Sequence, residues 1–420
     1  MPISLDHFLD RLVRFFTSLR LTVVCLALAL LLVFFGTMAQ VDLGLYKAQN
    51  EFFRSFFVYW GPKGASWRIP VFPGGYLIGG VLLINLLASQ FQRFVFTASK
   101  IGLWMVHVGL ILLLLGQLLT DLLSRESTLH LREGEAKNYS ETEREAELAV
   151  SDVTDPATDK VVAIPQGVLA GEKDIRPGDL PFTIRVKQFF PNSVVEDRPA
   201  DATQPPPATQ GIGPRAIVRG LPRITEMDRR DVPSAIVEVV SPQGSLGTWL
   251  VSEFVDQPQS FTLDNRTYDL VLRPLRLYKP YTIQLLTFRH DVYPGTDIPK
   301  NFSSRILLER PQTGEKREVL IYMNNPLRYA GETYYQSGFD PDNRGTILQV
   351  VHNPSWLTPY FSCVLVGAGL IVQFATHLLG FARKRRTACP APSRSTPHVS
   401  DIPVPAPCLP SGDSRLTRRG

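Results

Sequence analysis

A single histidine, His107, lies inside an otherwise apolar run from Ile101 to Leu119. A helix needs about 20 apolar residues to span a bilayer, and this run meets that length. A titratable imidazole in hydrocarbon is costly, so it is a functional-site hypothesis by default. The neutral ring is a common metal ligand and a frequent axial ligand of haem iron. The pattern therefore predicts an iron-binding ring in the membrane, and the alternative is an imidazole that only hydrogen-bonds a neighbouring carbonyl.

The helix around His107 has two different faces. Small residues recur every seven positions and form one stripe, at Gly102, Gly109 and Gly116. Small residues let a second membrane helix approach closely. At 100° per residue His107 points away from this stripe, toward Trp104, Ile111 and Leu114. We therefore expect the glycine face to pack within the chain, and the histidine face to be free for a ligand or a second subunit.

A second intramembrane histidine, His377, lies six residues before Arg383 in the last apolar stretch. This position predicts a similar depth on the same side of the membrane as His107. Two imidazoles at one level could hold a metal or haem iron between them, and the alternative is a histidine that snorkels at a helix end. The sequence assigns no role to His130, His290 or His352.

The chain of 420 residues alternates membrane and polar regions. Apolar stretches long enough to span occur at Leu21–Ala39, Gly74–Phe91, Ile101–Leu119 and Trp356–Phe381. We predict a membrane domain over 1–120 with three helices (21–39, 74–91 and 101–119), a β-rich domain over 121–355, and a fourth helix over 356–382. Within the β-rich domain, the Pro-rich region around 193–232 is expected to be a mobile insertion, and the basic, Pro-rich tail over 383–420 is expected to be disordered.

Charge and cysteine placement set the topology and exclude one class of enzyme. Basic clusters flank the spans on one side, which predicts cytoplasmic termini and an extracytoplasmic β-rich domain. The net charge of +5 needs no nucleic-acid partner, because the basic flanks of the spans supply much of the excess. The four cysteines all lie outside the β-rich block, and no CxxC occurs. This pattern excludes a thiol-disulfide enzyme and a covalently attached c-type haem.

The polar block alternates apolar and polar residues over many short runs, which predicts strands. Turns are indicated at Asp264–Arg266 and at Pro311–Lys316. Many short strands separated by turns favour a β-sandwich or an open barrel. In the first loop, Leu45–Trp60 mixes aromatic and charged residues, which predicts a short amphipathic helix at the membrane interface. The fold class is therefore a membrane protein of α+β type, with four transmembrane helices and a large sandwich-like β domain outside the cytoplasm.

Several motifs resemble the ResB family of cytochrome c biogenesis proteins. They are Ser18-Leu-Arg-Leu-Thr, Gly44-Leu-Tyr-Lys-Ala-Gln-Asn-Glu-Phe-Phe, His107-Val-Gly-Leu-Ile-Leu-Leu-Leu-Leu-Gly, Arg132-Glu-Gly-Glu, Tyr293-Pro-Gly-Thr-Asp-Ile-Pro-Lys-Asn-Phe and Met323-Asn-Asn-Pro-Leu-Arg-Tyr-Ala-Gly-Glu-Thr-Tyr-Tyr-Gln-Ser-Gly-Phe-Asp-Pro. The resemblance implies a haem-delivery subunit of CcsB type in a bacterial inner membrane, or in a thylakoid membrane if the source is photosynthetic. It also implies a ResC/CcsA-type membrane partner, which would carry the tryptophan-rich haem-handling motif absent here.

The resemblance further implies that haem is moved across the membrane and presented for attachment to CxxCH sites of apocytochromes c. The chain would be non-catalytic alone, as one subunit of a holocytochrome c synthase, with a separate thiol reductant for the apocytochromes. His107 matches the family's axial haem ligand, and the partner or His377 would supply the second. Trp104 is expected in the pocket wall, and Lys100 or Arg93 near the haem propionates. The alternative is a membrane-anchored scaffold that docks partner and apocytochrome without binding haem. A transporter of another substrate is disfavoured, because the spans contain few polar residues and no internal repeat occurs.

Overall fold

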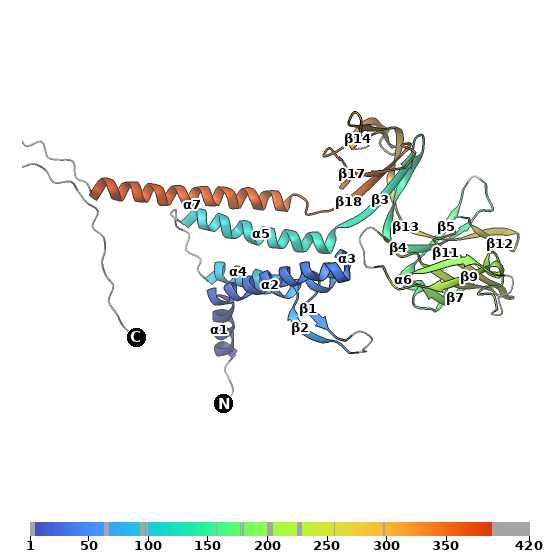
Figure 1. Ribbon diagram of the computed structural model, residues 1–420, viewed down its shortest axis with the longest axis horizontal. Coiled ribbons are helices and arrows are strands. Elements are labelled where there is room, and N and C mark those ends of the chain that lie inside the picture. The colour runs from blue at the N-terminus through green and yellow to red at the C-terminus, as the bar shows by residue number, and fades with distance from the viewer. Residues whose placement is uncertain are drawn as a thin grey trace, which may run out of the picture.

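The computed structural model describes residues 5–62, 67–92, 97, 100–156, 158–176, 178, 180–199, 205–224, 229–255, 257–296 and 299–388. Long helices gather at one end of the molecule and strands at the other (Figure 1). The helices are α1 Leu5–Phe16, α2 Leu19–Leu43, α3 Leu45–Ala48, the π-helix η1 Gln49–Phe53, α4 Gly75–Gln92, α5 Ile101–Leu123, α6 Gln166–Leu169, the 3₁₀-helix η3 Gly213–Arg215 and α7 Thr358–Ala388. Four of them, α2, α4, α5 and α7, are long and apolar enough to span a membrane, so the expected four apolar helices and large β-rich region are confirmed.

The strands begin in the first loop and then fill the region between α5 and α7. They are β1 Phe57–Trp60, β2 Ile69–Pro73, β3 Arg125–Arg132, β4 Ala136–Asp152, β5 Lys160–Pro165, β6 Asp174–Ile175, β7 Thr183–Phe190, β8 Ser193–Asp197, β9 Ala216–Gly220, β10 Ser234–Ser241, β11 Gly244–Ser252, β12 Gln259–Leu263, β13 Arg266–Val292, β14 Pro299–Arg310, β15 Glu315–Tyr322, β16 Leu327–Tyr329, β17 Glu332–Phe339 and β18 Gly345–His352. The turns expected at Asp264–Arg266 and Pro311–Lys316 join β12 to β13 and β14 to β15.

The β-rich region forms two lobes with separate cores. In one lobe the sheet β11-β10-β7-β6 shares a buried core with β5, β12 and the adjoining halves of β4 and β13, which is a sandwich arrangement. In the other lobe the large sheet curls so that β15 contacts β16 and β17 at its opposite end, as in an open barrel. Both architectures favoured by the sequence therefore occur, one in each lobe.

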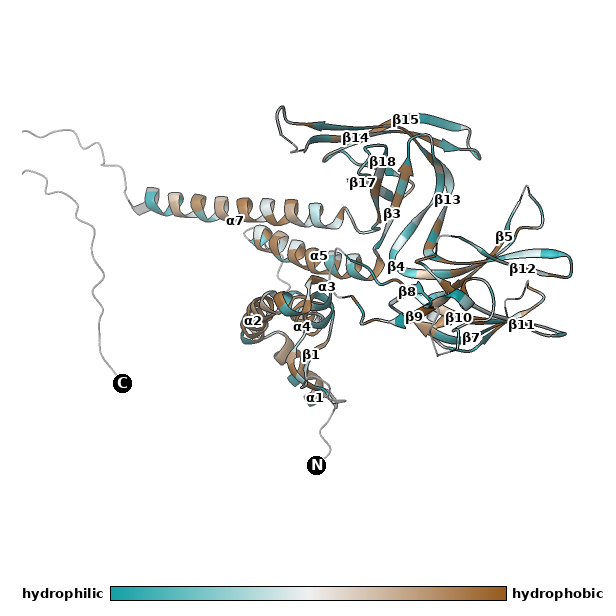
Figure 2. Cartoon of the chain, turned by 45° about the vertical axis from the view of Figure 1, so that its right-hand side comes forward, coloured by the Kyte–Doolittle hydropathy of each residue, from teal (hydrophilic) through white to brown (hydrophobic). Residues whose placement is uncertain are grey.

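Two long strands, β4 and β13, connect the lobes by running through both (Figure 2). Their pairing shifts register between Pro274 and Arg276 and again between Tyr278 and Ile283. A bulge bends a strand and increases its twist, and proline donates no ladder hydrogen bond. These interruptions allow one strand pair to serve two differently oriented cores.

Polar side chains tie the membrane helices together at two depths. Asn85 of α4 is 1% exposed. Its amide donates to the carbonyls of Phe16 (2.6 Å) and Ser18 (3.2 Å), and its Oδ1 accepts from Thr22 (2.6 Å). A buried amide in hydrocarbon is costly unless such bonds satisfy it. Asn85 thereby fixes the junction of α1 and α2 against α4.

Near the β-rich region, Asp121 of α5 forms a second tie. Its carboxylate lies 2.7 Å from the Arg54 guanidinium, and it also accepts a hydrogen bond from the Tyr76 hydroxyl of α4. The side chain of Asp121 is only 11% exposed. The first loop, α4 and α5 are thus held at one level by a single carboxylate.

Three local expectations are corrected by the structure. The amphipathic helix expected over Leu45–Trp60 is wrong beyond Phe53, because Phe57–Trp60 pairs with Ile69–Pro73 as an antiparallel hairpin. The insertion expected to be mobile over 193–232 contains the paired strands β8 and β9, which pack on the buried cluster around Leu250. Helix α7 continues to Ala388, past the expected end at 382, and the tail from 389 lies outside the described residues.

Candidate functional site

The ring of His107 is held by its own helix. Its Nδ1 lies 2.8 Å from the carbonyl oxygen of Leu103, one turn earlier in α5. A carbonyl only accepts, so Nδ1 carries the proton and Nε2 keeps the lone pair. Within the described residues Nε2 has no hydrogen-bond partner. A backbone carbonyl that fixes the tautomer in this way is the usual support of a histidine that binds a metal through Nε2.

The glycine stripe packs against α7. A Cβ added to these glycines would lie 2.5 Å from Gln373 N at Gly102, 2.6 Å from Val366 Cγ2 at Gly109 and 2.7 Å from Thr358 Cγ2 at Gly116. No real Cβ tolerates such distances, so only glycine permits this approach of the two helices. The packing expected for the stripe is observed, and its partner helix, which the sequence left open, is α7.

The face that carries His107 is less open than expected. His107 and Trp104 are half-buried, and Ile111 on the same face is only 9% exposed. Helix α5 contacts α4 as well as α7. Neighbouring side chains therefore cover part of the histidine face, and its availability to a ligand or a second subunit stays a prediction. The ring lies in an apolar, partly enclosed environment.

His377 does not lie beside His107. Position 107 falls between Gly102, which meets Gln373, and Gly109, which meets Val366. His377 is one turn beyond Gln373, so about ten residues of α7 separate the two levels. At 1.5 Å per residue the separation along the helix axis is about 15 Å. The predicted similar depth is wrong, because helix register follows from the glycine contacts and not from the distance to flanking charges.

The surroundings of His377 fit the snorkelling alternative. The side chain is exposed, and the Gln373 amide nitrogen lies 2.8 Å from His377 Nε2. An amide NH₂ only donates, so it occupies the lone pair that a metal would need. The chain does not bring the two histidines together as ligands of one iron.

The remaining candidates divide between described and undescribed positions. Lys100 is exposed at the start of α5, seven residues or about 10 Å along the helix from His107. Trp104 lies one turn before His107 on the same side of α5. Arg93, the other candidate for the propionates, lies outside the described residues.

The donor set around His107 suits a haem better than a bare metal ion. Among the described residues no group of three or more His, Cys, Asp or Glu side chains could hold a metal. A bare ion needs several protein ligands, whereas haem brings four nitrogens of its own and needs only axial ligation. His107, one imidazole among Leu, Ile and Trp side chains, is of the residue type that could supply such a ligand.

The motif that ends the β-rich region builds a buried ionic cluster. Glu332 lies 2.5 Å from Lys279 Nζ, and it accepts hydrogen bonds from Tyr281 (2.7 Å) and Tyr334 (2.8 Å). Burial alone would raise the pKa of Glu332, but these three donors outweigh it and hold the pKa below its usual range. Burial is also the main cause that raises the pKa values of both tyrosines. This part of the motif therefore stabilises the fold.

Histidines of the β-rich region also have local partners. His130 Nε2 lies 2.9 Å from Asp340 Oδ1. His290 Nδ1 lies 3.1 Å from Asn343 Oδ1, and its ring stacks on Phe302 at 5.0 Å between centroids. These contacts give both residues local hydrogen-bonding roles within the β-rich region.

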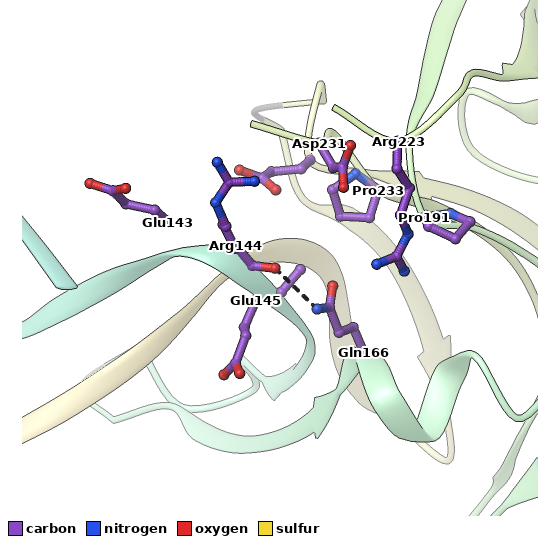
Figure 3. Close-up of a pocket in the computed structure, with 10 residues that line it drawn as sticks. Glu143, Arg144, Glu145, Gln166, Pro191, Arg223, Asp231 and Pro233 are labelled. Carbon is purple, nitrogen blue, oxygen red and sulfur yellow. Dashed lines mark hydrogen bonds between the residues drawn. The ribbon is translucent and has the colours of Figure 1, made fainter. Parts of the chain in front are cut away.

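A polar pocket lies where β4 bends between the lobes (Figure 3). Its wall includes Glu143, Glu145, Gln166, Arg223, Asp231 and Glu253, and the Arg144 carbonyl accepts a 3.2 Å hydrogen bond from the Gln166 amide. Burial raises the pKa of Glu253, an effect that Arg230 opposes and Glu141 strengthens. The pocket contains none of the residues singled out from the sequence.

Comparison with known proteins supports the resemblance seen in the motifs. The model of the ResB-like family matches residues 240–347, which contain the motifs beginning at Tyr293 and Met323. Protein NrfI of Wolinella succinogenes is 24% identical over 295 residues, which cover 70% of this chain and 29% of that protein. The chain thus spans less than a third of the length of this curated relative. The resemblance of this chain to the ResB family of cytochrome c biogenesis proteins is thereby confirmed.

Proposed function

We propose that this chain is a haem-handling membrane subunit of a cytochrome c maturation complex, of the CcsB type within the ResB family. The supporting observation is His107: an imidazole in an apolar helix, with Nδ1 bonded to Leu103 O and Nε2 available as a ligand. The family resemblance supports the place of the chain in cytochrome c biogenesis. Haem is the cargo, which the complex moves across the membrane and presents to CxxCH sites of apocytochromes.

In this proposal His107 supplies one axial nitrogen, and a ResC/CcsA-type partner supplies the other. The partner is favoured over His377 because about 15 Å of helix separates His377 from the level of His107. Half-buried Trp104 forms part of the pocket wall. Lys100, exposed at the helix start, meets a propionate at the membrane surface, where a cation is not desolvated.

The topology of the proposal follows from the basic flanks of the spans. The termini are cytoplasmic, and the β-rich region lies on the opposite side of a bacterial inner membrane or a thylakoid membrane. There it docks the partner and the apocytochrome. Thioether formation requires reduced cysteines, and the β-rich region from 121 to 355 contains no cysteine. A separate thiol reductant therefore serves the apocytochromes.

Co-purification with and without the presumed partner tests the proposal. We expect the complex to carry haem in a pyridine haem assay, and we expect a variant with His107→Ala to carry much less. The matched control is His377→Ala, which should retain the wild-type haem content. A complex that matures cytochromes but shows no haem absorbance would favour the alternative, a scaffold that docks proteins without binding haem.

A further inference from the structure

The hairpin formed by β1 and β2 exposes an unusual number of large apolar side chains. Exposed fractions are Phe56 63%, Phe57 43%, Tyr59 54%, Trp60 58%, Trp67 54%, Ile69 48% and Val71 52%. Val58, 7% exposed, and half-buried Phe72 turn toward the helices, where they join the cluster around Leu32 and Ile78. Exposed large apolar side chains that gather on one short hairpin indicate an interaction surface.

The hairpin has no support from other strands. It is a two-stranded sheet by itself, with Val58 opposite Phe72 and Trp60 opposite Ile69. A two-stranded hairpin is marginally stable in water, and an apolar edge strand in water invites aggregation. Both figures place it beside α2 and α4, on the side away from α5 and α7 (Figures 1 and 2). Among the residues that the structure describes, neither the β-rich region nor the α5–α7 pair covers the two strands.

The lengths of the neighbouring helices fix its level in the membrane. Helix α4 begins at Gly75, separated from β2 by one residue, and its 18 residues extend about 27 Å, close to the thickness of a hydrocarbon core of about 30 Å. Helix α5 covers about 20 residues from Ile101 before the first charged side chain, Asp121. Asp121 binds Arg54 and Tyr76, which immediately flank the hairpin. The base of the hairpin therefore lies at the boundary between hydrocarbon and headgroups.

We propose that this hairpin is a membrane-interface anchor, seated among the phospholipid headgroups on the side of the β-rich region. Tyrosine and tryptophan favour that zone because their rings are apolar while their O–H and N–H groups meet polar partners. The headgroup layer is about 5–8 Å deep on each side, which accommodates a hairpin lying along the surface. Arg68 lies beside Trp67 at 4.0 Å from the Glu51 carboxylate, and its 66% exposed side chain can also reach lipid phosphates. This inference is independent of haem binding at His107.

Depth-dependent quenching of tryptophan emission tests the anchor in the full chain, reconstituted in phosphatidylcholine vesicles. The difference between wild type and a variant with Trp60→Phe and Trp67→Phe isolates the emission of the hairpin. We expect this emission to be lost most strongly with lipids brominated near the carbonyl end of the acyl chain, less with lipids brominated near the methyl end, and least with aqueous acrylamide. A matched variant, Trp249→Phe, removes a buried core ring and should leave the lipid-quenched component unchanged.

Two outcomes would overturn the anchor. Strong quenching by acrylamide with none by brominated lipid would place the hairpin in water. Protection from both quenchers would mean that protein covers it, either a second copy or another subunit. Thermal unfolding of the Trp60→Phe/Trp67→Phe variant checks that the fold is retained, and an unfolded variant is replaced by one with Trp67→Phe alone, because Trp67 lies outside both strands.

Discussion

Replacing Lys279 by Met tests whether the Glu332 cluster of the ResB-like motif is structural. The side chains of Lys279 and Glu332 are 6% and 17% exposed, and their charged atoms lie 2.5 Å apart. Removing one partner of a buried pair leaves an uncompensated charge, which costs about 3–5 kcal/mol. We therefore expect Lys279→Met to destabilise the β-rich region by about that amount. The Tyr281 and Tyr334 hydroxyls still donate to Glu332, so the lower end of the range is expected.

Urea unfolding of the full chain in detergent, followed by near-ultraviolet circular dichroism, measures this loss. With a slope of about 1–3 kcal/mol per M urea, the midpoint should fall by at least about 1 M. The double variant Lys279→Met/Glu332→Gln removes both charges and keeps an acceptor for the tyrosines, so it should recover most of the stability. The surface control is Lys316→Met, whose partner is Glu309; both are exposed, and a loss below about 1 kcal/mol is expected.

The stability lost by the Lys279→Met variant should depend on pH in a definite direction. In the native chain the pKa of Glu332 is lowered, so its contribution to stability is present above the unfolded pKa and is lost as pH falls through the folded value. Without Lys279, burial loses its main opponent, so we expect the pKa of Glu332 to be higher in the variant than in the native chain, and the stability lost by the variant to grow as pH rises. Its deficit should be larger near about pH 8 than near about pH 5. A deficit under about 1 kcal/mol at both values, or a double variant no better than the single one, would refute the cluster's structural role.

Two further substitutions test the membrane helices. Gly109→Val places carbon atoms where Val366 of α7 already lies 2.6 Å from an ideal Cβ, so we expect a lower thermal midpoint in detergent and reduced haem content. Gly367→Val is its control, because no atom of a neighbouring element lies within 4 Å of a Cβ built there. If the two substitutions lowered the midpoint equally, the close packing of the α5 glycine stripe on α7 would be contradicted. Asn85→Leu removes the hydrogen-bond partner of the Phe16 carbonyl and of the Thr22 hydroxyl, whereas the Ser18 carbonyl keeps its backbone donors. It should cost about 1–2 kcal/mol in the same assay, and an unchanged thermal midpoint would show that Asn85 does not hold these helices together.

Most of what the sequence predicts about this fold comes from the length of its apolar runs and from the spacing of apolar residues within them. The four spans are visible because each is a long apolar run, and the end of α5 was missed only where Asp121 enters the helix. Helix α1 was not predicted, because Leu5–Phe16 mixes charged and apolar residues next to a span. The sequence predicts a helix where the hairpin at Phe57 lies, because aromatic and charged residues in a short loop fit both the helical and the strand period.

The sequence does not show how residues far apart in the chain align with one another, either between paired strands or between packed helices. Strand β13 continues through Pro274 because a register shift absorbs the missing donor, and no local pattern predicts its two lobes. At the candidate site, the glycine stripe of α5 was readable from spacing, but its partner α7 was not. The level of His377 depends on which residues of α7 meet Gly102 and Gly109, so its separation from His107 emerges only from the packed helices.

The most direct test of the central claim is the optical spectrum of the purified complex with His107→Ala, before and after imidazole is added. If His107 Nε2 binds iron, the variant should lose the bis-nitrogen haem spectrum or most of its haem, and free imidazole should restore the wild-type bands. A variant with unchanged haem content and an unchanged spectrum, unaffected by imidazole, would contradict haem ligation by His107.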